Sequence, residues 1–299
     1  MRAHRILSAL SLALVVGTSA QAQNTLKDGT SLQWDRQITV GQVPLKTDSA
    51  EYPALAVQVY EADGSQVWSL LKKELPGAEF KKSGKLMKAP GVSIGTGMAT
   101  PVDLLASVTE NKKERVSTLV LAPLVAGTTN PATDAALEPA VRELAVKLNK
   151  AVVQQQLDQW TKQLGKADNK AEGAAADKDK AQERVNKAQA ELEKITKEKS
   201  KLQNQHAVLQ KEIDLHNQKW TLSQDPKDLK KLTKARSKIT KNESQMAKVM
   251  AKEAKIQTEL TKSSSNLPDA QKKQEEKAAS QADVQRTVDA LKRKLESIR

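Results

Sequence analysis

The sequence predicts an α+β protein in which a small antiparallel sheet packed by helices is followed by a long antiparallel α-helical coiled-coil hairpin. Three observations lead to this prediction. Five of the seven aromatic residues of the 299-residue chain lie before residue 132. Apolar residues alternate in that first part with the period of a strand. Residues 132–299 are instead rich in Ala, Lys, Gln, Glu and Leu, with a heptad pattern. We therefore expect a small α+β domain at 23–131 and a helical coiled-coil region at 132–299.

The strands of the first domain are predicted from alternation of apolar and polar side chains. The half-buried segments are 52–60, 102–108 and 116–122, and a short hairpin is expected from 79–82 and 85–88. The connection at 110–115 is short and polar. It favours antiparallel pairing, because parallel strands need a longer crossover.

Two helices are expected to cover this sheet. One follows Asp63-Gly64-Ser65, which breaks the preceding strand and offers a cap, and it ends at Pro76-Gly77. The other begins near 133–138, and its apolar stripe starts at Val141. Both helices carry apolar residues at helical spacing, so each is predicted to bury one side.

The heptad positions of the coiled coil can be assigned from the sequence. The seam steps by 4 and 3 residues from Ala181 to Trp220, and nine of its twelve positions are apolar. Residues 223–227 interrupt it, and a return seam follows from Leu232 to Leu260. If the chain folds back there, residue i lies beside the residue numbered about 451 minus i, because both helices rise by the same distance, about 1.5 Å per residue.

A second interruption is expected at 263–268, which contains three serines and a proline. A last seam then runs from Val284 to Ile298. The tail is therefore either one two-helix hairpin or a three-helix fold with a turn at 263–268. An oligomer formed through the coil is compatible with either arrangement.

The first 22 residues are predicted to be a secretory signal peptide. A basic start with Arg2 and Arg5 precedes the 12-residue apolar run of 6–17, and Ala20 and Ala22 supply the small residues of a cleavage site. The run is too short for a stable membrane span, which needs about 17–25 residues. We therefore expect a periplasmic or secreted protein.

Charge and cysteine content narrow the function classes. The chain has no Cys, which excludes disulfide scaffolds, cysteine–zinc sites, iron–sulfur clusters and thiol catalysis. Residues 132–299 hold 35 Lys+Arg against 25 Asp+Glu, whereas 23–131 are nearly balanced at 12 against 11. The basic region predicts a protein partner or an anionic cell-envelope component. Nucleic acid is disfavoured by the export signal and the lack of an aromatic stacking surface.

No catalytic residue, metal site or cofactor is predicted. Gly91-Val-Ser93-Ile-Gly95 matches the nucleophile elbow of serine hydrolases, but that motif needs a strand–turn–helix and a histidine base. The histidines that follow it, His206 and His216, lie on the coiled coil. The same glycine-rich loop lacks the Gly-Lys-Ser/Thr of a phosphate-binding loop. The protein is thus expected not to be an enzyme.

Four residues of the predicted hairpin are candidates for function. His206 and His216 occupy seam positions ten residues apart, which is too far for a metal pair on one helix. They are interpreted as polar residues that fix the register, or as a pH-sensitive pair that loosens the hairpin when protonated. Trp220 and Leu222, near the hairpin end, are interpreted either as a partner contact or as a cap on the seam.

The export signal, the absence of Cys and the basic Lys/Gln/Ala-rich arms resemble uncharacterised exported bacterial proteins that join a small α+β head to a coiled-coil tail. There is a weaker resemblance to OmpH-like periplasmic chaperones, which have a β core and basic hairpin arms. The first resemblance implies a non-enzymatic structural or interaction protein that presents its hairpin to a partner. The second implies a holdase-type chaperone. A head domain that binds a small molecule is a third alternative.

Overall fold

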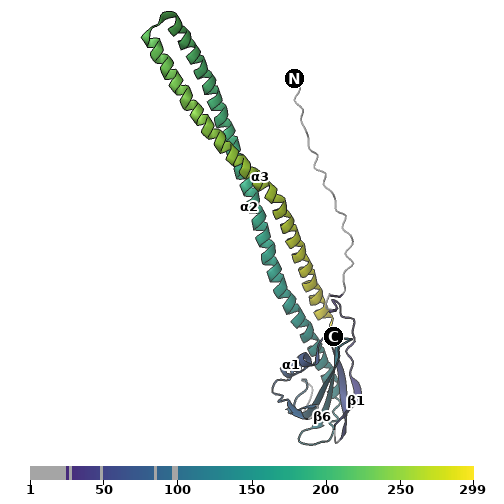
Figure 1. The fold of residues 1–299 in the computed structure, drawn as a ribbon. Coiled ribbons are helices and arrows are strands. Elements are labelled where there is room, and N and C mark those ends of the chain that lie inside the picture. Colours follow the sequence, from purple (N-terminus) through teal and green to yellow (C-terminus); the bar gives the residue numbers. More distant parts are fainter. Residues whose placement is uncertain (1–24, 27–28, 48–49, 84–85, 96–99) are drawn as a thin grey trace, which may run out of the picture. The chain divides into compact units, whose positions relative to one another are not determined.

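The computed structural model describes residues 25–26, 29–47, 50–83, 86–95 and 100–299 (Figure 1). The expected signal peptide at 1–22 lies outside these residues. The chain forms two compact units, each described by itself below. The head unit comprises residues up to Lys162 together with Gln285–Arg299, and the hairpin unit comprises Gln163–Val284. None of the described helices is long and apolar enough to cross a bilayer.

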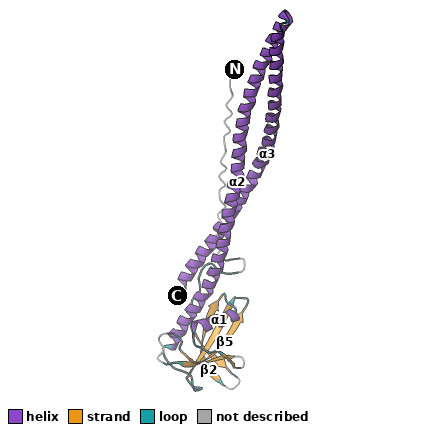
Figure 2. Cartoon of the chain, turned by 90° about the vertical axis from the view of Figure 1, so that its left-hand side faces the viewer, coloured by secondary structure: helices purple, strands orange, loops and turns teal. Residues whose placement is uncertain are grey.

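The head contains an antiparallel sheet, as the sequence predicts (Figure 2). The sheet has six strands. Its order is β1-β2-β6-β5-β4-β3, and every neighbouring pair is antiparallel. The strands are β1 Gly41–Lys46, β2 Glu51–Tyr60, β3 Lys81–Ser83, β4 Leu86–Val92, β5 Val102–Asn111 and β6 Val116–Val125. Residues 84–85, at the connection of the hairpin expected from 79–82 and 85–88, are outside the described part of the chain.

Strand β1 was not predicted, because its sequence GQVPLK is short and contains Pro44. Proline cannot donate to a ladder, so it is tolerated mainly at sheet edges. β1 is such an edge, since it pairs only with β2. Its Val43 and Leu45 face the same side of the sheet as Ala54 and Tyr52, their partners in the register.

Helix α1, Gly64–Glu74, begins where the sequence predicts. The Asp63 carboxylate caps it by accepting the Gln66 N–H at 2.8 Å. Val67, Leu70 and Leu71 are buried and form its inner side. The helix therefore covers the sheet with the apolar stripe that its sequence carries.

The main core lies on one side of the sheet. It unites buried residues of β2, β4, β5 and β6 with α1, the first part of α2 and the end of α3. Val141 and Leu148 of α2 are fully buried there, and so is Ile298, which directly follows α3. A smaller cluster, with Leu105 and Leu124, lies on the other side. The last turn of α3 is thus part of the head's core.

Helices α2, Leu137–Ser223, and α3, Pro226–Ser297, pack as an antiparallel hairpin, which confirms the predicted fold class. Gln224 ends α2 with a left-handed φ of 51° and donates its N–H to the Trp220 carbonyl. The Asp225 carboxylate then accepts the Lys227 N–H at 2.8 Å and starts α3. Two residues therefore reverse the chain.

Three ion pairs report the register of the hairpin. They are Asp177–Lys273 at 3.1 Å, Lys199–Glu253 at 2.7 Å and Glu212–Lys238 at 3.6 Å. Their residue numbers add up to between 450 and 452, close to the expected 451. The fold-back point inferred from the seam is therefore the observed one.

The interruption expected at 263–268 is wrong, and with it the three-helix alternative. α3 runs through these residues with Pro268 inside the helix. The reason is that the 3–4 spacing of covered residues continues without a shift: Ser263 is buried, and Leu267 and Ala270 are partly buried. Packing along an unbroken seam offsets the local cost of proline, about 3 kcal/mol in a helix interior.

Candidate functional sites

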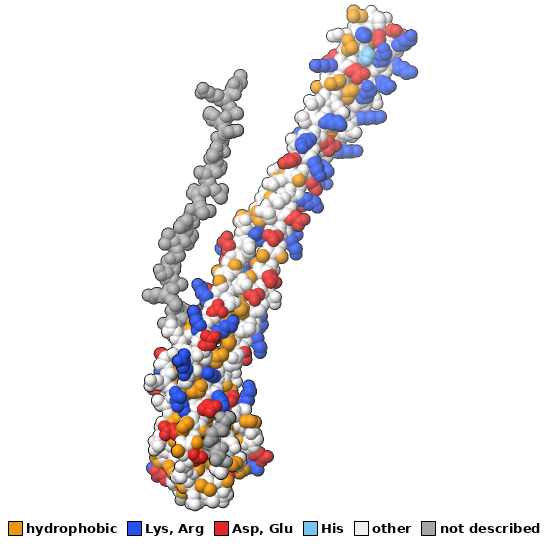
Figure 3. Space-filling view, turned by 180° about the vertical axis from the view of Figure 1, so that it is seen from behind, with side chains coloured by type: hydrophobic (Ala, Val, Ile, Leu, Met, Phe, Trp, Pro, Cys, Tyr) orange, Lys and Arg blue, Asp and Glu red, His pale blue; other side chains and the backbone are white. Residues whose placement is uncertain are grey.

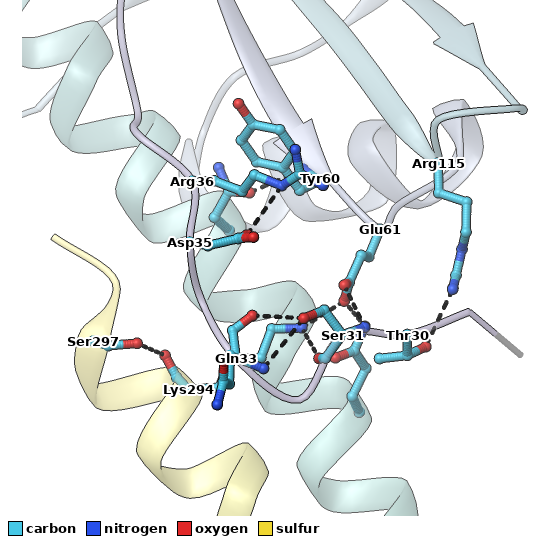
Figure 4. Close-up of polar contacts among 12 residues, drawn as sticks. Thr30, Ser31, Gln33, Asp35, Arg36, Tyr60, Glu61, Arg115, Lys294 and Ser297 are labelled. Atoms are coloured by element: carbon cyan, nitrogen blue, oxygen red, sulfur yellow. Dashed lines mark hydrogen bonds and ion pairs between the residues drawn. The ribbon is translucent and has the colours of Figure 1, made fainter. Parts of the chain in front are cut away.

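The most buried charge of the described chain is Lys294, near the end of α3 (Figure 4). Its side chain is 1% exposed. The ammonium group donates to the Glu61 carboxylate and to the Ser31 carbonyl, both at 2.6 Å. Glu61 also accepts the Ser31 N–H at 2.9 Å and the Gln156 side-chain amide at 3.0 Å. Four distant segments of the head unit therefore meet at one carboxylate.

The local backbone conformation positions the Glu61 carboxylate to accept these hydrogen bonds. It follows β2 directly and has a left-handed φ of 56°. Its N–H donates to the Arg115 carbonyl at 2.6 Å, which ties it to the turn between β5 and β6. Arg115 in turn donates to the Thr30 hydroxyl. The chain reverses around Glu61 so that its side chain reaches the end of α3.

This cluster fits a structural role. A buried ammonium with a carboxylate and a carbonyl as partners is compensated, whereas either charge alone would be costly to bury. A side chain with 1% exposure cannot touch a substrate. The contacts fix the last turn of α3 to the head. Sequence reasoning missed Lys294, although it lies between the buried Leu291 and Ile298 at helical spacing.

The Gly91-Val-Ser93-Ile-Gly95 motif lies at the bulged end of β4. The Asp103 carboxylate accepts the Gly91 N–H at 3.0 Å and the Gly127 N–H at 3.3 Å, and so holds this end against the loop after β6. Gly95 has a φ of 75°, and a Cβ there would lie 3.3 Å from that of Ala140. The glycines thus serve backbone geometry and close packing. Both described histidines belong to the hairpin unit, whereas Ser93 belongs to the head unit.

A groove of about 720 Å³ lies on the head beside the edge strand β1. Its walls are β1, β2 and the segment between β6 and α2, with Tyr52 and Pro53 among the lining residues. The acidic residues Glu51, Asp134 and Glu138 also line it, and the Glu51 carboxylate lies 3.8 Å from the Lys46 ammonium. None of its described lining residues is Lys or Arg. The groove is therefore apolar and acidic.

The two seam histidines have different surroundings. His206 Nε2 lies 3.4 Å from the Glu243 carboxylate, so a protonated His206 would form an ion pair across the seam. His216 has its Nδ1 buried without a hydrogen-bond partner. The geometry does not bring the two rings together as one site. Loosening of the hairpin by acid therefore stays a prediction.

Trp220 and Leu222 also differ from each other. Trp220 is partly buried at its seam position, which fits a cap on the seam. Leu222 is 87% exposed, which fits a contact surface. Two further apolar residues of α2, Val208 and Leu215, are 65% and 49% exposed. The sequence analysis missed these two, although the spacing of seven residues between them and Leu222 is visible in the sequence.

Comparison with known proteins adds no further constraint. No protein-family model matches the chain, and a search of curated proteins finds no significant similarity. Among the described residues no group of three or more His, Cys, Asp or Glu could hold a metal ion.

Proposed function

We propose that the protein is a non-enzymatic periplasmic interaction protein that presents the distal part of its helical hairpin to a partner. The observation that carries this proposal is the distribution of exposed apolar side chains. The described residues expose six large hydrophobic side chains, and five of them lie on α2 and α3. Four of these five lie between Val208 and Leu229, around the end of the hairpin.

These side chains are not needed for the hairpin itself. The seam is filled by other residues, among them Ile195, Leu202, Val249 and Ile256, which are buried. Solvent-facing positions of a coiled coil are normally polar. A row of apolar residues outside the seam therefore supports a second contact, made with a partner.

Site-specific photo-crosslinking in cells of the bacterium that makes the protein tests this proposal. A photoreactive amino acid is placed at Leu215 or Leu222 and, as a matched control, at Asp214 or Thr221 on the other side of the same helix. We expect crosslinked products from the first pair only. Equal products from both pairs, or none from either, would contradict the proposal.

The groove on the head supports a second candidate function, binding of a small molecule with an apolar body and a cationic group. Its apolar lining and three carboxylates favour such a ligand. An alkyl amine should raise the melting temperature of the head more than the matching alkyl alcohol. The variant Glu51→Gln/Glu138→Gln should remove that difference. An amine and an alcohol with the same effect on the unchanged protein would argue against this candidate.

A further inference from the structure

We infer that one face of the distal hairpin binds the surface of an anionic phospholipid bilayer. The inference rests on the proposed function and names the partner. The face, called the basic face here, combines apolar residues of α2 with lysines of α3. It consists of Val208, Leu215, Leu222, Lys227, Lys231, Lys234, Lys238 and Lys241.

The heptad phase places the apolar residues in one row. The seam residues His206, Ile213 and Trp220 occupy heptad position a. Position c comes two residues later in each heptad and is occupied by Val208, Leu215 and Leu222. Position c neighbours g on the helix surface and lies outside the seam. The row spans 14 residues, which is about 21 Å of helix.

The same phase places the lysines in two rows. On α3, with Leu232 and Ile239 as a, Lys227, Lys234 and Lys241 occupy c, and Lys231 and Lys238 occupy g. All five are exposed. Lys238 is 3.6 Å from Glu212 and Lys231 is 3.9 Å from Asp228, so these two are partly paired on the hairpin surface.

An ion pair shows that the apolar row and the lysine rows share one side of the hairpin. Glu212 and Lys238 both occupy g and lie 3.6 Å apart, so the g positions of the two helices adjoin. The c positions flank them on either helix. Figure 3 shows Lys and Arg side chains gathered along the distal hairpin with hydrophobic ones beside them.

The opposite side of the distal hairpin lacks this combination. Its b and e positions include the exposed Leu229 of α3, but their charged residues are Asp214 on α2 with Arg236 and Glu243 on α3, and these charges nearly cancel. The positive charge is therefore directed to one side. A planar array of negative charges complements such a side better than a small ion would.

The residue types favour lipid over protein. Protein interfaces are depleted in Lys and enriched in Arg, Tyr and Trp. The basic face has five lysines and neither Arg nor Tyr, and the seam residue Trp220 is its nearest aromatic. Lysines next to exposed leucines are typical of peripheral binding, in which ammonium groups reach phosphates and apolar side chains enter the headgroup boundary.

Vesicle co-sedimentation of the full mature chain tests the inference. The chain should bind vesicles of phosphatidylglycerol with phosphatidylcholine at low salt and release them as salt rises, and it should not bind phosphatidylcholine alone. Lys227→Gln/Lys234→Gln/Lys241→Gln should weaken binding about a hundredfold. Leu215→Ser/Leu222→Ser should weaken it about tenfold or more.

The matched control removes the same charge from other sides of the hairpin, as Lys211→Gln/Lys230→Gln/Arg236→Gln. It should weaken binding much less. The absence of binding to the anionic vesicles, or an equal loss in the control, would overturn the inference. Binding to polyglutamate without binding to vesicles would also overturn it, and would assign the face to an acidic protein.

These outcomes are separable from a failure of the proposed function. If vesicles are not bound but Leu215 and Leu222 still crosslink in cells, only the lipid is wrong. If neither occurs, the proposed function fails as well.

Discussion

Glu61 and Lys294 are 233 positions apart in the sequence and form the most buried ion pair of the described chain. Nothing in the periodicity of either segment indicates that they meet. A lysine among 49 Lys and Arg residues is, from the sequence alone, most simply a solvated side chain. This contact could not be predicted because it depends on how the end of α3 packs on the turn after β2.

The two partners should respond differently to substitution. Glu61→Gln leaves the Lys294 ammonium buried without a carboxylate, and we expect it to cost about 3 kcal/mol of unfolding free energy. Lys294→Met should cost less, because Glu61 keeps the Ser31 and Gln156 donors. The double variant should be more stable than Glu61→Gln alone. Urea unfolding followed by tryptophan fluorescence measures this, and strictly additive losses would contradict it.

Asp63 gives a pH-dependent prediction. Hydrogen bonds from the Ser65 hydroxyl and the Gln66 N–H lower the pKa of its carboxyl group. A pKa that is lower in the folded than in the unfolded state stabilises the fold above the unfolded value, about 3.9. That stabilisation is lost as pH falls through the folded value.

The substitution Asp63→Ala should therefore destabilise the head at neutral pH, by about 1 kcal/mol for a lost helix cap. The difference from the unchanged protein should shrink at pH values below about 4. Urea unfolding at neutral and acidic pH measures both effects. A difference that does not change with pH would show that the charge of Asp63 is not involved.

At the scale of elements, regular patterns were predictable and exceptions were not. Alternation located β2, β5 and β6, and the cap residue Asp63 located α1. The edge strand β1 was missed because a proline such as Pro44 normally indicates the end of a strand, except at the edge of a sheet. The expected break in α3 was wrong because packing along the uninterrupted seam outweighs the low helix propensity of 263–268.

The seam contains a polar position whose removal should stabilise the hairpin. Asn242 is 5% exposed, and its amide N–H donates to the Leu202 carbonyl at 3.2 Å. Its Oδ1 is buried without a partner. Asn242→Leu should raise the unfolding free energy of the hairpin by about 1 kcal/mol, because it removes an unsatisfied acceptor. Thermal unfolding followed by far-UV circular dichroism measures this, and a lower midpoint would contradict it.

The charge asymmetry of the whole chain has a structural counterpart. Residues 132–299 hold most of the excess of Lys and Arg. Within them, Lys227, Lys231, Lys234, Lys238 and Lys241 of α3 share one side of the hairpin with the exposed leucines of α2. Both the seam phase and the point of reversal were readable in the sequence. Together they imply the basic face, whose apolar row includes Leu222.

The most direct test of the account is chemical protection of that face in the cell. The chain has no Cys, so the single-cysteine variants Leu215→Cys and Asp214→Cys can each be labelled with a maleimide without background. In purified protein both should react at similar rates, because both residues are exposed. In intact cells, residue 215 should react at least several-fold more slowly and residue 214 at an unchanged rate. Equal rates for both in cells would contradict the claim that this side of the hairpin is the surface that the protein presents.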